Sequence, residues 1–160
     1  MIAALTERWE LGRARDRFAG RFVAGRIPRL DERQPPRVAL LAPQTFYNDA
    51  GRAVGPARGA LKLALERVLV VHDEIDLPFG DVRTRLGGGL AGNNGLRSIR
   101  QALGGEDFMR VRVGVGRPDS TDPEIVASYV LGRFREARPE VEALVAEACR
   151  QVDAAVRAED

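Results

Sequence analysis

The most constraining feature of this sequence is a run of four apolar residues that leads directly into an acidic stretch. Residues 68–71 read Val-Leu-Val-Val, and residues 72–78 read His-Asp-Glu-Ile-Asp-Leu-Pro. An unbroken apolar run is typical of a strand that is covered on both faces. Carboxylates at the end of such a strand stand where α/β proteins commonly bind ligands. The stretch therefore predicts a central strand with polar chemistry at its carboxyl end.

The other segments alternate between strand and helix patterns, which favours an α/β layered domain. The predicted strands are 22–27, 38–41, 68–71, 81–86 and 110–115. The predicted helices are the end of a helix over 1–9, then 51–65, 95–103, and a C-terminal amphipathic helix with the apolar stripe Val141, Leu144, Val145, Ala148, Val152 and Val156. There is no internal repeat, so the 160 residues are interpreted as one domain.

Composition excludes several classes of protein. No apolar run approaches the roughly 20 residues that span a bilayer, and we expect neither a signal peptide nor a compartment other than the cytoplasm. The single cysteine, Cys149, excludes an internal disulfide and a cysteine metal cluster; its apolar helical surroundings predict an inert core residue. The formal charge of +2 does not by itself require a nucleic-acid partner. Lys62 is the only lysine, and an arginine bias is compatible with RNA binding as well as with genome composition.

Residues 87–95 contain five glycines in nine positions and precede a predicted helix. Such a loop lets the backbone approach a ligand closely, or serves as a flexible turn. A P-loop is not indicated, because Leu96 and Arg97 follow Gly95 where lysine and a hydroxyl residue are needed. The fit to a dinucleotide-binding fingerprint is also poor.

The acidic stretch permits two further interpretations. Asp73, Glu74 and Asp76 could hold a hard cation, but they lack the spacing and glycine of a calcium loop. His72 is the only histidine, and successive strand residues point to opposite faces. If Asp73 faces a cleft, His72 faces away from it, which predicts a structural histidine.

Taken together, several segments resemble the bacterial-type peptidyl-tRNA hydrolase family. They are residues 43–51 (Pro-Gln-Thr-Phe-Tyr-Asn-Asp-Ala-Gly), residues 70–80, the glycine stretch with its helix at 87–99, and residues 107–118. The resemblance implies a single three-layer αβα domain with a mixed sheet over residues 1–160. It also implies a monomeric, cytoplasmic enzyme without metal or cofactor, which hydrolyses the ester between a nascent peptide and the acceptor end of tRNA.

The resemblance assigns roles residue by residue. Asp73 matches an aspartate that supports a general-base histidine, a division of labour that fixes the tautomer of the base. Phe46, Asn48 and Asn94 match substrate-contacting positions. Tyr47 and Asn93 stand at such positions where the family has methionine and histidine. The basic positions expected to meet tRNA phosphates are Arg85 and Arg112, for which an exposed strand face is an equal alternative.

The chain also departs from the family pattern. The family opens with a strand and a histidine–asparagine pair, whereas Met1 matches a position inside the first helix, so we expect this segment and the general base to be missing. One hypothesis is an active hydrolase whose start lies upstream. A second is an inactive relative that binds RNA through Arg83, Arg85, Arg110 and Arg112. A third is a nucleotide-phosphate binder that uses the glycine stretch.

Overall fold

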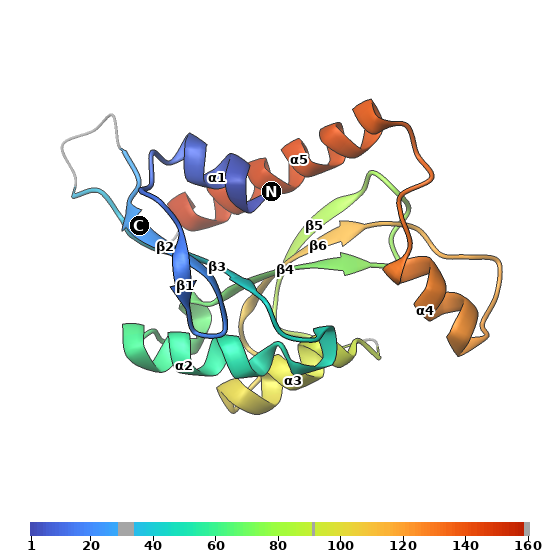
Figure 1. Cartoon of the computed structure of the whole chain (residues 1–160), viewed down its shortest axis with the longest axis horizontal. Coiled ribbons are helices and arrows are strands. Elements are labelled where there is room, and N and C mark those ends of the chain that lie inside the picture. Colours follow the sequence, from blue (N-terminus) through green and yellow to red (C-terminus); the bar gives the residue numbers. More distant parts are fainter. Residues whose placement is uncertain (29–33, 91, 159–160) are drawn as a thin grey trace. The chain divides into compact units, whose positions relative to one another are not determined.

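The computed structural model describes residues 1–28, 34–90 and 92–158, and the chain divides into two compact units. Unit 1 contains residues 1–68 and 86–108, and unit 2 contains residues 69–85 and 109–158. The α/β class and the mixture of parallel and antiparallel strands are confirmed. The strands form two three-stranded sheets, β1–β3 in the blue-to-teal part of the chain and β4–β6 in its green and orange parts (Figure 1). The interpretation of residues 1–160 as one domain stays a prediction.

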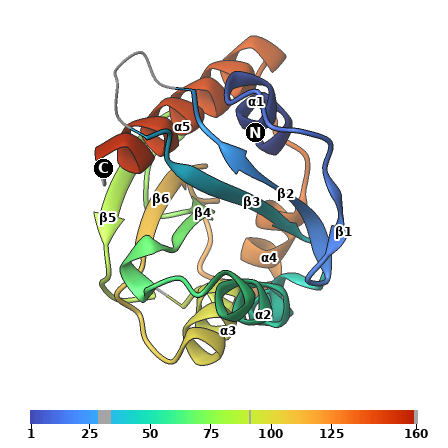
Figure 2. The same ribbon diagram turned by 90° about the vertical axis from the view of Figure 1, so that its left-hand side faces the viewer.

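The sheet of unit 1 is antiparallel. It contains β1 (Arg15–Arg17), β2 (Gly20–Arg26) and β3 (Arg37–Pro43) in that spatial order (Figure 2). The predicted strands 22–27 and 38–41 are confirmed as β2 and β3. Strand β1 was not predicted, because its three residues are all exposed and carry no apolar alternation. The buried side chains of Phe22 and Leu40 form part of the core of this unit.

Three helices accompany this sheet in unit 1. Helix α1 (Ile2–Arg8) contacts β3, and Leu5 and the adjoining Trp9 are each only 1% exposed. Helices α2 (Gly51–Leu61) and α3 (Asn94–Leu103) pack against each other, side by side in Figures 1 and 2. All three were predicted, but α2 ends four residues earlier than expected.

The early end of α2 has a local cause. Lys62 takes a left-handed conformation with φ of 52°, which cannot continue a right-handed helix. The next residues form a short 3-10 turn, η2 (Leu65–Arg67), instead of a further helical turn.

The sheet of unit 2 is mixed. Its strands are β4 (Leu69–Glu74), β5 (Val82–Leu86) and β6 (Met109–Gly114), with β6 in the middle. Strands β4 and β6 are parallel. The hydrogen bonds from Gly114 N to Asp81 O and from Gly87 N to Phe108 O flank the β5–β6 pair, so these strands run antiparallel. The three strands were predicted. However, β4 lies at the edge of this sheet and its apolar residues are only partly buried, so the prediction of a central strand covered on both faces was wrong.

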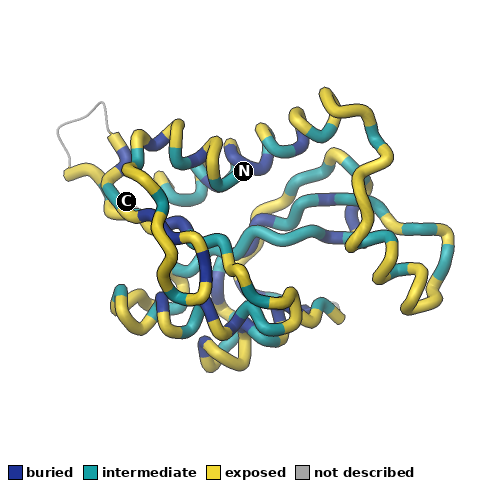
Figure 3. The backbone as a smooth tube through the Cα atoms, in the orientation of Figure 1, coloured by how far each residue is buried: buried dark blue, intermediate teal, exposed yellow. Residues whose placement is uncertain are grey.

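Two helices complete unit 2. Helix α5 (Arg138–Ala158) contacts β6 and buries Leu144, Ala148, Cys149 and Val152, so the predicted stripe and the buried cysteine are confirmed (Figure 3). Helix α4 (Pro123–Leu131) was not predicted, because none of its residues is fully buried. Its start could have been read from Asp122, whose carboxylate accepts hydrogen bonds from the amides of Glu124 and Ile125. Within the described residues, no helix is long and apolar enough to cross a membrane.

Candidate active site

Asp73 lies near the carboxyl end of β4, beside Val113 of β6, and it lines a pocket. The pocket has a volume of about 640 Å³, within the range of small-molecule sites. Its wall consists of Asp73 with residues from the end of β6, from α4 and from the connection to α5. The lining residues are Asp73, Val115, Ser128, Tyr129, Val130, Gly132, Arg133, Phe134, Arg135 and Glu136.

Two contacts hold α4 and the following connection against the strands of unit 2. The hydroxyl of Tyr129 donates a hydrogen bond of 2.6 Å to the carbonyl of Val115, which directly follows β6. The ring of Phe134 meets the ring of Phe79 edge to face, with centroids 6.2 Å apart. Because both contacts anchor to residues after β4 and β6, α4 lies beyond the carboxyl ends of these strands.

An ion pair between a buried carboxylate and a partly buried arginine holds the strand end that carries Asp73. Glu74 is 7% exposed, and its Oε2 accepts a hydrogen bond of 3.0 Å from Nε of Arg112 on β6. Its Oε1 accepts from the amide of Asp76 at 3.2 Å, and its carbonyl accepts from the amide of Val115. Glu74 therefore ties β4, the following turn and β6 together immediately beside Asp73.

A second pair connects the same turn to the end of β6. Asp76 Oδ1 accepts a hydrogen bond of 2.5 Å from Nη2 of Arg117, and both side chains are about half exposed. The negative charges of Glu74 and Asp76 are thus each balanced by an arginine. In the part of the chain that the structure describes, no group of three histidine, cysteine, aspartate or glutamate residues is arranged to hold a metal ion.

His72 is held by its own strand and does not line the pocket. Its Nδ1 lies 2.7 Å from the carbonyl oxygen of Asp73, an acceptor, so Nδ1 carries the proton in this contact. Its buried Nε2 has no hydrogen-bond partner among the described residues. Burial lowers the pKa of His72, against the opposing effects of the Asp73 carbonyl and the carboxylates of Glu74 and Asp73. A structural histidine was predicted, and this geometry agrees with it.

The second group of candidate residues lies in unit 1, where the loop before α2 packs on α3. The 3-10 turn η1 (Tyr47–Asp49) contacts α3. A Cβ on Gly95 would lie 2.9 Å from Cε2 of Tyr47, and a Cβ on Gly51 would clash with the backbone oxygen of Ser98. Gly51 N also donates to Oγ of Ser98 at 2.9 Å. Glycine at both positions is needed for this close approach.

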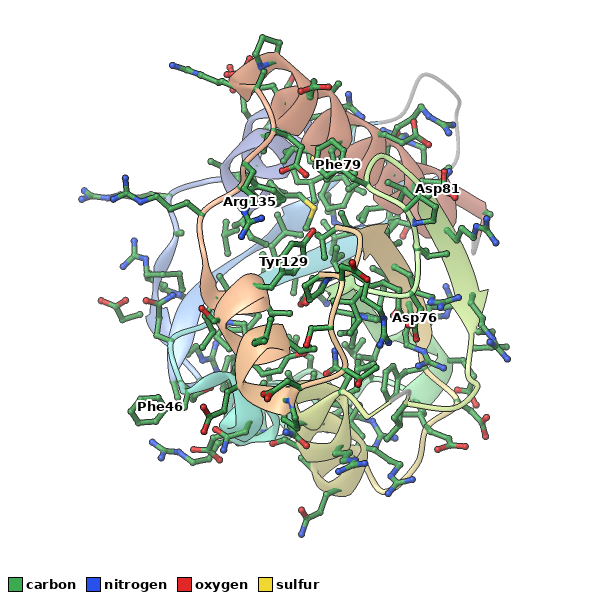
Figure 4. All side chains as sticks on the ribbon, turned by 90° about the vertical axis from the view of Figure 1, so that its right-hand side faces the viewer. Phe46, Asp76, Phe79, Asp81, Tyr129 and Arg135 are labelled. Atoms are coloured by element: carbon green, nitrogen blue, oxygen red, sulfur yellow. The ribbon has the colours of Figure 1, made fainter. Side chains whose placement is uncertain are left out.

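This packing brings the loop that carries Phe46, Tyr47 and Asn48 next to the start of α3, with Asn93 and Asn94. Phe46 is 85% exposed and points into solvent (Figure 4), and Tyr47 is 45% exposed. Asn48 and Asn94 are also exposed. The site residues of unit 1 and Asp73 of unit 2 belong to different units, and each group is defined within its own unit.

Asn93 has a structural task that the sequence interpretation did not include. Its Oδ1 accepts a hydrogen bond of 2.8 Å from the amide of Leu96, so Asn93 is the N-cap of α3. This bond occupies an amide that a phosphate would need. One amide at the helix end of the glycine stretch is thus already bound, and the hypothesis of a nucleotide-phosphate site there stays a prediction.

The predicted basic surface is only partly exposed. Arg85 is exposed on β5, whereas Arg112 is paired with Glu74. Arg83 pairs with Asp81 at 3.1 Å. Arg110 is 3% exposed, because it is an interior residue of β6. The prediction that it forms part of an RNA-binding surface was therefore wrong.

Comparison with known proteins decides the family. The family model described as peptidyl-tRNA hydrolase matches residues 1–160. The chain belongs to this family. A peptidyl-tRNA hydrolase of Geotalea daltonii is 52% identical over 101 residues, which are 63% of this chain and 51% of the relative. One of Rhodopseudomonas palustris (strain BisA53) is 47% identical over 132 residues, which are 82% of this chain and 61% of the relative.

The fold agrees with solved structures of the peptidyl-tRNA hydrolase family. The crystal structure of peptidyl-tRNA hydrolase from Acinetobacter baumannii matches with a TM-score of 0.81 at 30% identity, covering 99% of this chain and 77% of that one. The chain spans about half the length of the curated relatives it matches.

The sequence patterns did not reveal all the residues around this candidate site. Glu74 was considered only as a metal ligand, yet it forms the buried pair with Arg112. Tyr129 and the arginines at 133 and 135 were not considered, because α4 itself was not predicted. The N-cap signal at Asp122 is the one local pattern that could have pointed to this wall of the pocket.

Proposed function

We propose that the protein hydrolyses the ester bond of peptidyl-tRNA, releasing the peptide and a free tRNA. The observation that carries the proposal is Asp73, which lines a pocket at the carboxyl end of β4 in a chain matched along residues 1–160 by the peptidyl-tRNA hydrolase family. The partner is the acceptor end of tRNA, and we propose that the protein acts in the cytoplasm as a monomer.

The proposed chemistry needs a general base, and Asp73 is proposed to support it. A histidine would take a proton from water, while Asp73 holds the imidazole in the correct tautomer and stabilises the imidazolium that forms. His72 does not suit the role of base, because its Nδ1 is engaged with the Asp73 carbonyl and it does not line the pocket. We therefore propose that the base is the histidine of the histidine–asparagine pair with which the family opens, and not His72.

The residues of unit 1 are proposed to position the substrate. The exposed amides of Asn48 and Asn94 can bind the acceptor end, which places the ester for attack. The exposed rings of Phe46 and Tyr47 offer surfaces on which bases of single-stranded RNA stack. Asn93 can contribute only its amide NH₂, because its oxygen caps α3.

Arg85 and Arg112 are proposed as phosphate contacts, and Arg85 is the more accessible of the two. Arg85 is exposed, and a phosphate can approach its guanidinium directly. Arg112 engages Glu74 through Nε, and its terminal nitrogens make no hydrogen bond within the described ranges 1–28, 34–90 and 92–158. A phosphate at Arg112 would therefore share the guanidinium with Glu74.

The test is release of labelled acyl-peptide from peptidyl-tRNA by a form of the protein that includes an upstream histidine–asparagine segment. Asp73→Asn in this form should lower kcat by roughly 10²–10⁴-fold with little change in affinity for tRNA, because the base loses its orientation. The matched control is Asp76→Asn, which removes a carboxylate from the same turn but not from the pocket wall. Unchanged turnover in Asp73→Asn would refute the assigned role.

Residues 1–160 alone provide the second arm of the experiment. We expect release only by the longer form. Release by neither form, with tRNA binding that weakens as salt rises, would instead support an inactive RNA-binding relative.

A further inference from the structure

The arginines of unit 2 differ in whether a carboxylate balances their charge. Six of them form ion pairs. These pairs are Arg83–Asp81, Arg112–Glu74, Arg117–Asp76, Arg138–Glu142, Arg150–Glu147 and Arg157–Asp153. Arg133 and Arg135, by contrast, pair with no carboxylate within the described parts of the chain, and both line the pocket that contains Asp73.

The connection that carries these two arginines is anchored between them. Phe134 packs edge to face on Phe79, and Gly132 lies so close to α4 that a Cβ there would be 2.9 Å from the carbonyl oxygen of Ser128. Arg135 and Tyr129, both labelled in Figure 4, line the same pocket. The anchor keeps the neighbours of Phe134 at the pocket wall, where their charges are available to a ligand.

The carboxylates of the pocket do not balance these arginines directly. Glu136 also lines the pocket, but its Oε2 accepts a hydrogen bond of 3.0 Å from the backbone amide of Arg135 rather than from a guanidinium. Asp73 is the other acidic group of the wall. Two guanidinium groups without a carboxylate partner, in a concave site, fit an anion with several oxygens, such as a phosphate.

The rest of the wall restricts the kind of phosphate compound. Val115, Tyr129, Val130 and Phe134 contribute apolar and aromatic surface on which a base can pack, and Asp73 can accept a hydrogen bond from a hydroxyl group. A nucleoside with a phosphate on its 5′ side fits all three parts of the wall. Its phosphate would meet the two arginines, its base the apolar and aromatic surface, and a sugar hydroxyl Asp73.

We propose that Arg133 and Arg135 form a subsite for the phosphodiester on the 5′ side of the terminal adenosine of the substrate. This inference rests on the proposed function and adds the residues that recognise the end of the RNA chain. Each guanidinium donates to the phosphodiester oxygens, so the terminal nucleotide is held with its sugar toward Asp73. The subsite distinguishes an RNA end from a free acyl-nucleoside.

The experiment compares two probes that differ by one phosphodiester. Both are 3′-(N-acetylphenylalanyl)amino-3′-deoxyadenosine, in which an amide replaces the ester and cannot be hydrolysed by this route; one has a free 5′-hydroxyl and the other a 5′-methylphosphate diester. Binding to the 160-residue chain is measured by isothermal titration calorimetry. We expect the diester to bind on the order of tenfold more tightly, as a charge-assisted pair of hydrogen bonds provides.

Variants identify the residues responsible. Arg133→Gln combined with Arg135→Gln should bring the two affinities together by weakening only the diester. The pair Arg133→Lys and Arg135→Lys should keep part of the preference, because lysine retains the charge without the planar fork. The matched control is Arg138→Gln, which removes an exposed arginine of the same region that pairs with Glu142 and does not line the pocket. Circular dichroism confirms that each variant is folded.

The outcomes separate this subsite from the proposed function. Equal binding of both probes to the unaltered chain, or a preference that survives in the double glutamine variant, overturns the subsite. Binding of neither probe also overturns it. The proposed hydrolysis is judged independently by peptide release and by Asp73→Asn, so each idea can fail without the other.

Discussion

The two units hold their candidate site residues by opposite means. In unit 1, close backbone contacts at Gly51 and Gly95 position the loop, and the side chains of Phe46 and Asn48 are exposed. In unit 2, a charged side chain that is itself buried, Glu74, ties the strand end to β6 through Arg112. In unit 1, backbone packing thus positions the candidate site residues, whereas in unit 2 an ion pair between side chains positions them.

This difference determines which substitutions destabilise the fold. An exposed side chain at the unit 1 site can be truncated with little loss of stability, because few of its atoms contact the protein. Truncating one partner of a buried ion pair leaves the other charge without compensation in a region of low dielectric. Measurements of stability can therefore test whether the two units differ in this way.

The largest effect is expected for Glu74→Ala. It removes the partner of Arg112 and should lower the free energy of unfolding by about 3–5 kcal/mol. Urea denaturation followed by circular dichroism measures this. Combining Glu74→Ala with Arg112→Ala should recover part of the loss, since no unpaired charge then remains.

The control for this prediction is Asp76→Ala, in the same turn. Its pair with Arg117 has side chains 46% and 45% exposed, so its loss should change stability by no more than about 1 kcal/mol. Equal losses for the two variants would show that burial does not distinguish these pairs.

An intermediate effect is expected for Gly95→Ala in unit 1. The new Cβ would lie 2.9 Å from Cε2 and 3.2 Å from the backbone oxygen of Tyr47, so η1 must move away from α3. We expect a loss of about 1–3 kcal/mol, read from the urea midpoint.

The matched control is Gly59→Ala, in helix α2, where a Cβ meets nothing within 4 Å. This change should stabilise the protein by about 0.4–1 kcal/mol, because it reduces the conformational freedom of the unfolded chain. A loss of stability at both glycines would contradict the view that close approach, rather than glycine itself, matters at residue 95.

The smallest effect concerns the pH dependence contributed by His72. Burial lowers the pKa of His72 below its ordinary value of 6.5, so the unfolded chain binds its proton more readily than the folded chain. This group therefore destabilises the fold as pH falls below 6.5 towards the folded pKa, and has no such effect at higher pH. His72→Gln should flatten the dependence of the free energy of unfolding between about pH 7 and pH 5. An identical slope in both proteins would contradict a buried, neutral His72.

Sequence patterns predicted an element correctly where the segment itself has a clear apolar periodicity. Alternating or continuous apolar residues identified β2, β3, β4, β5 and β6, and a stripe at helical spacing identified α5. The start of α3 and the position of Asp73 after a strand were also readable. Patterns failed for β1 and α4, because neither segment has a buried apolar face.

The α/β class, most element positions, the family and the placement of Asp73 at a strand end could all be predicted from the sequence. Three features became visible only in the folded chain: Glu74 pairs with Arg112, Arg110 is buried, and Arg133 and Arg135 share a pocket with Asp73. The physical reason is separation along the chain: Glu74 and Arg112 are 38 residues apart. Periodicity reports the face of one element, whereas the partner of a charge depends on which elements pack together.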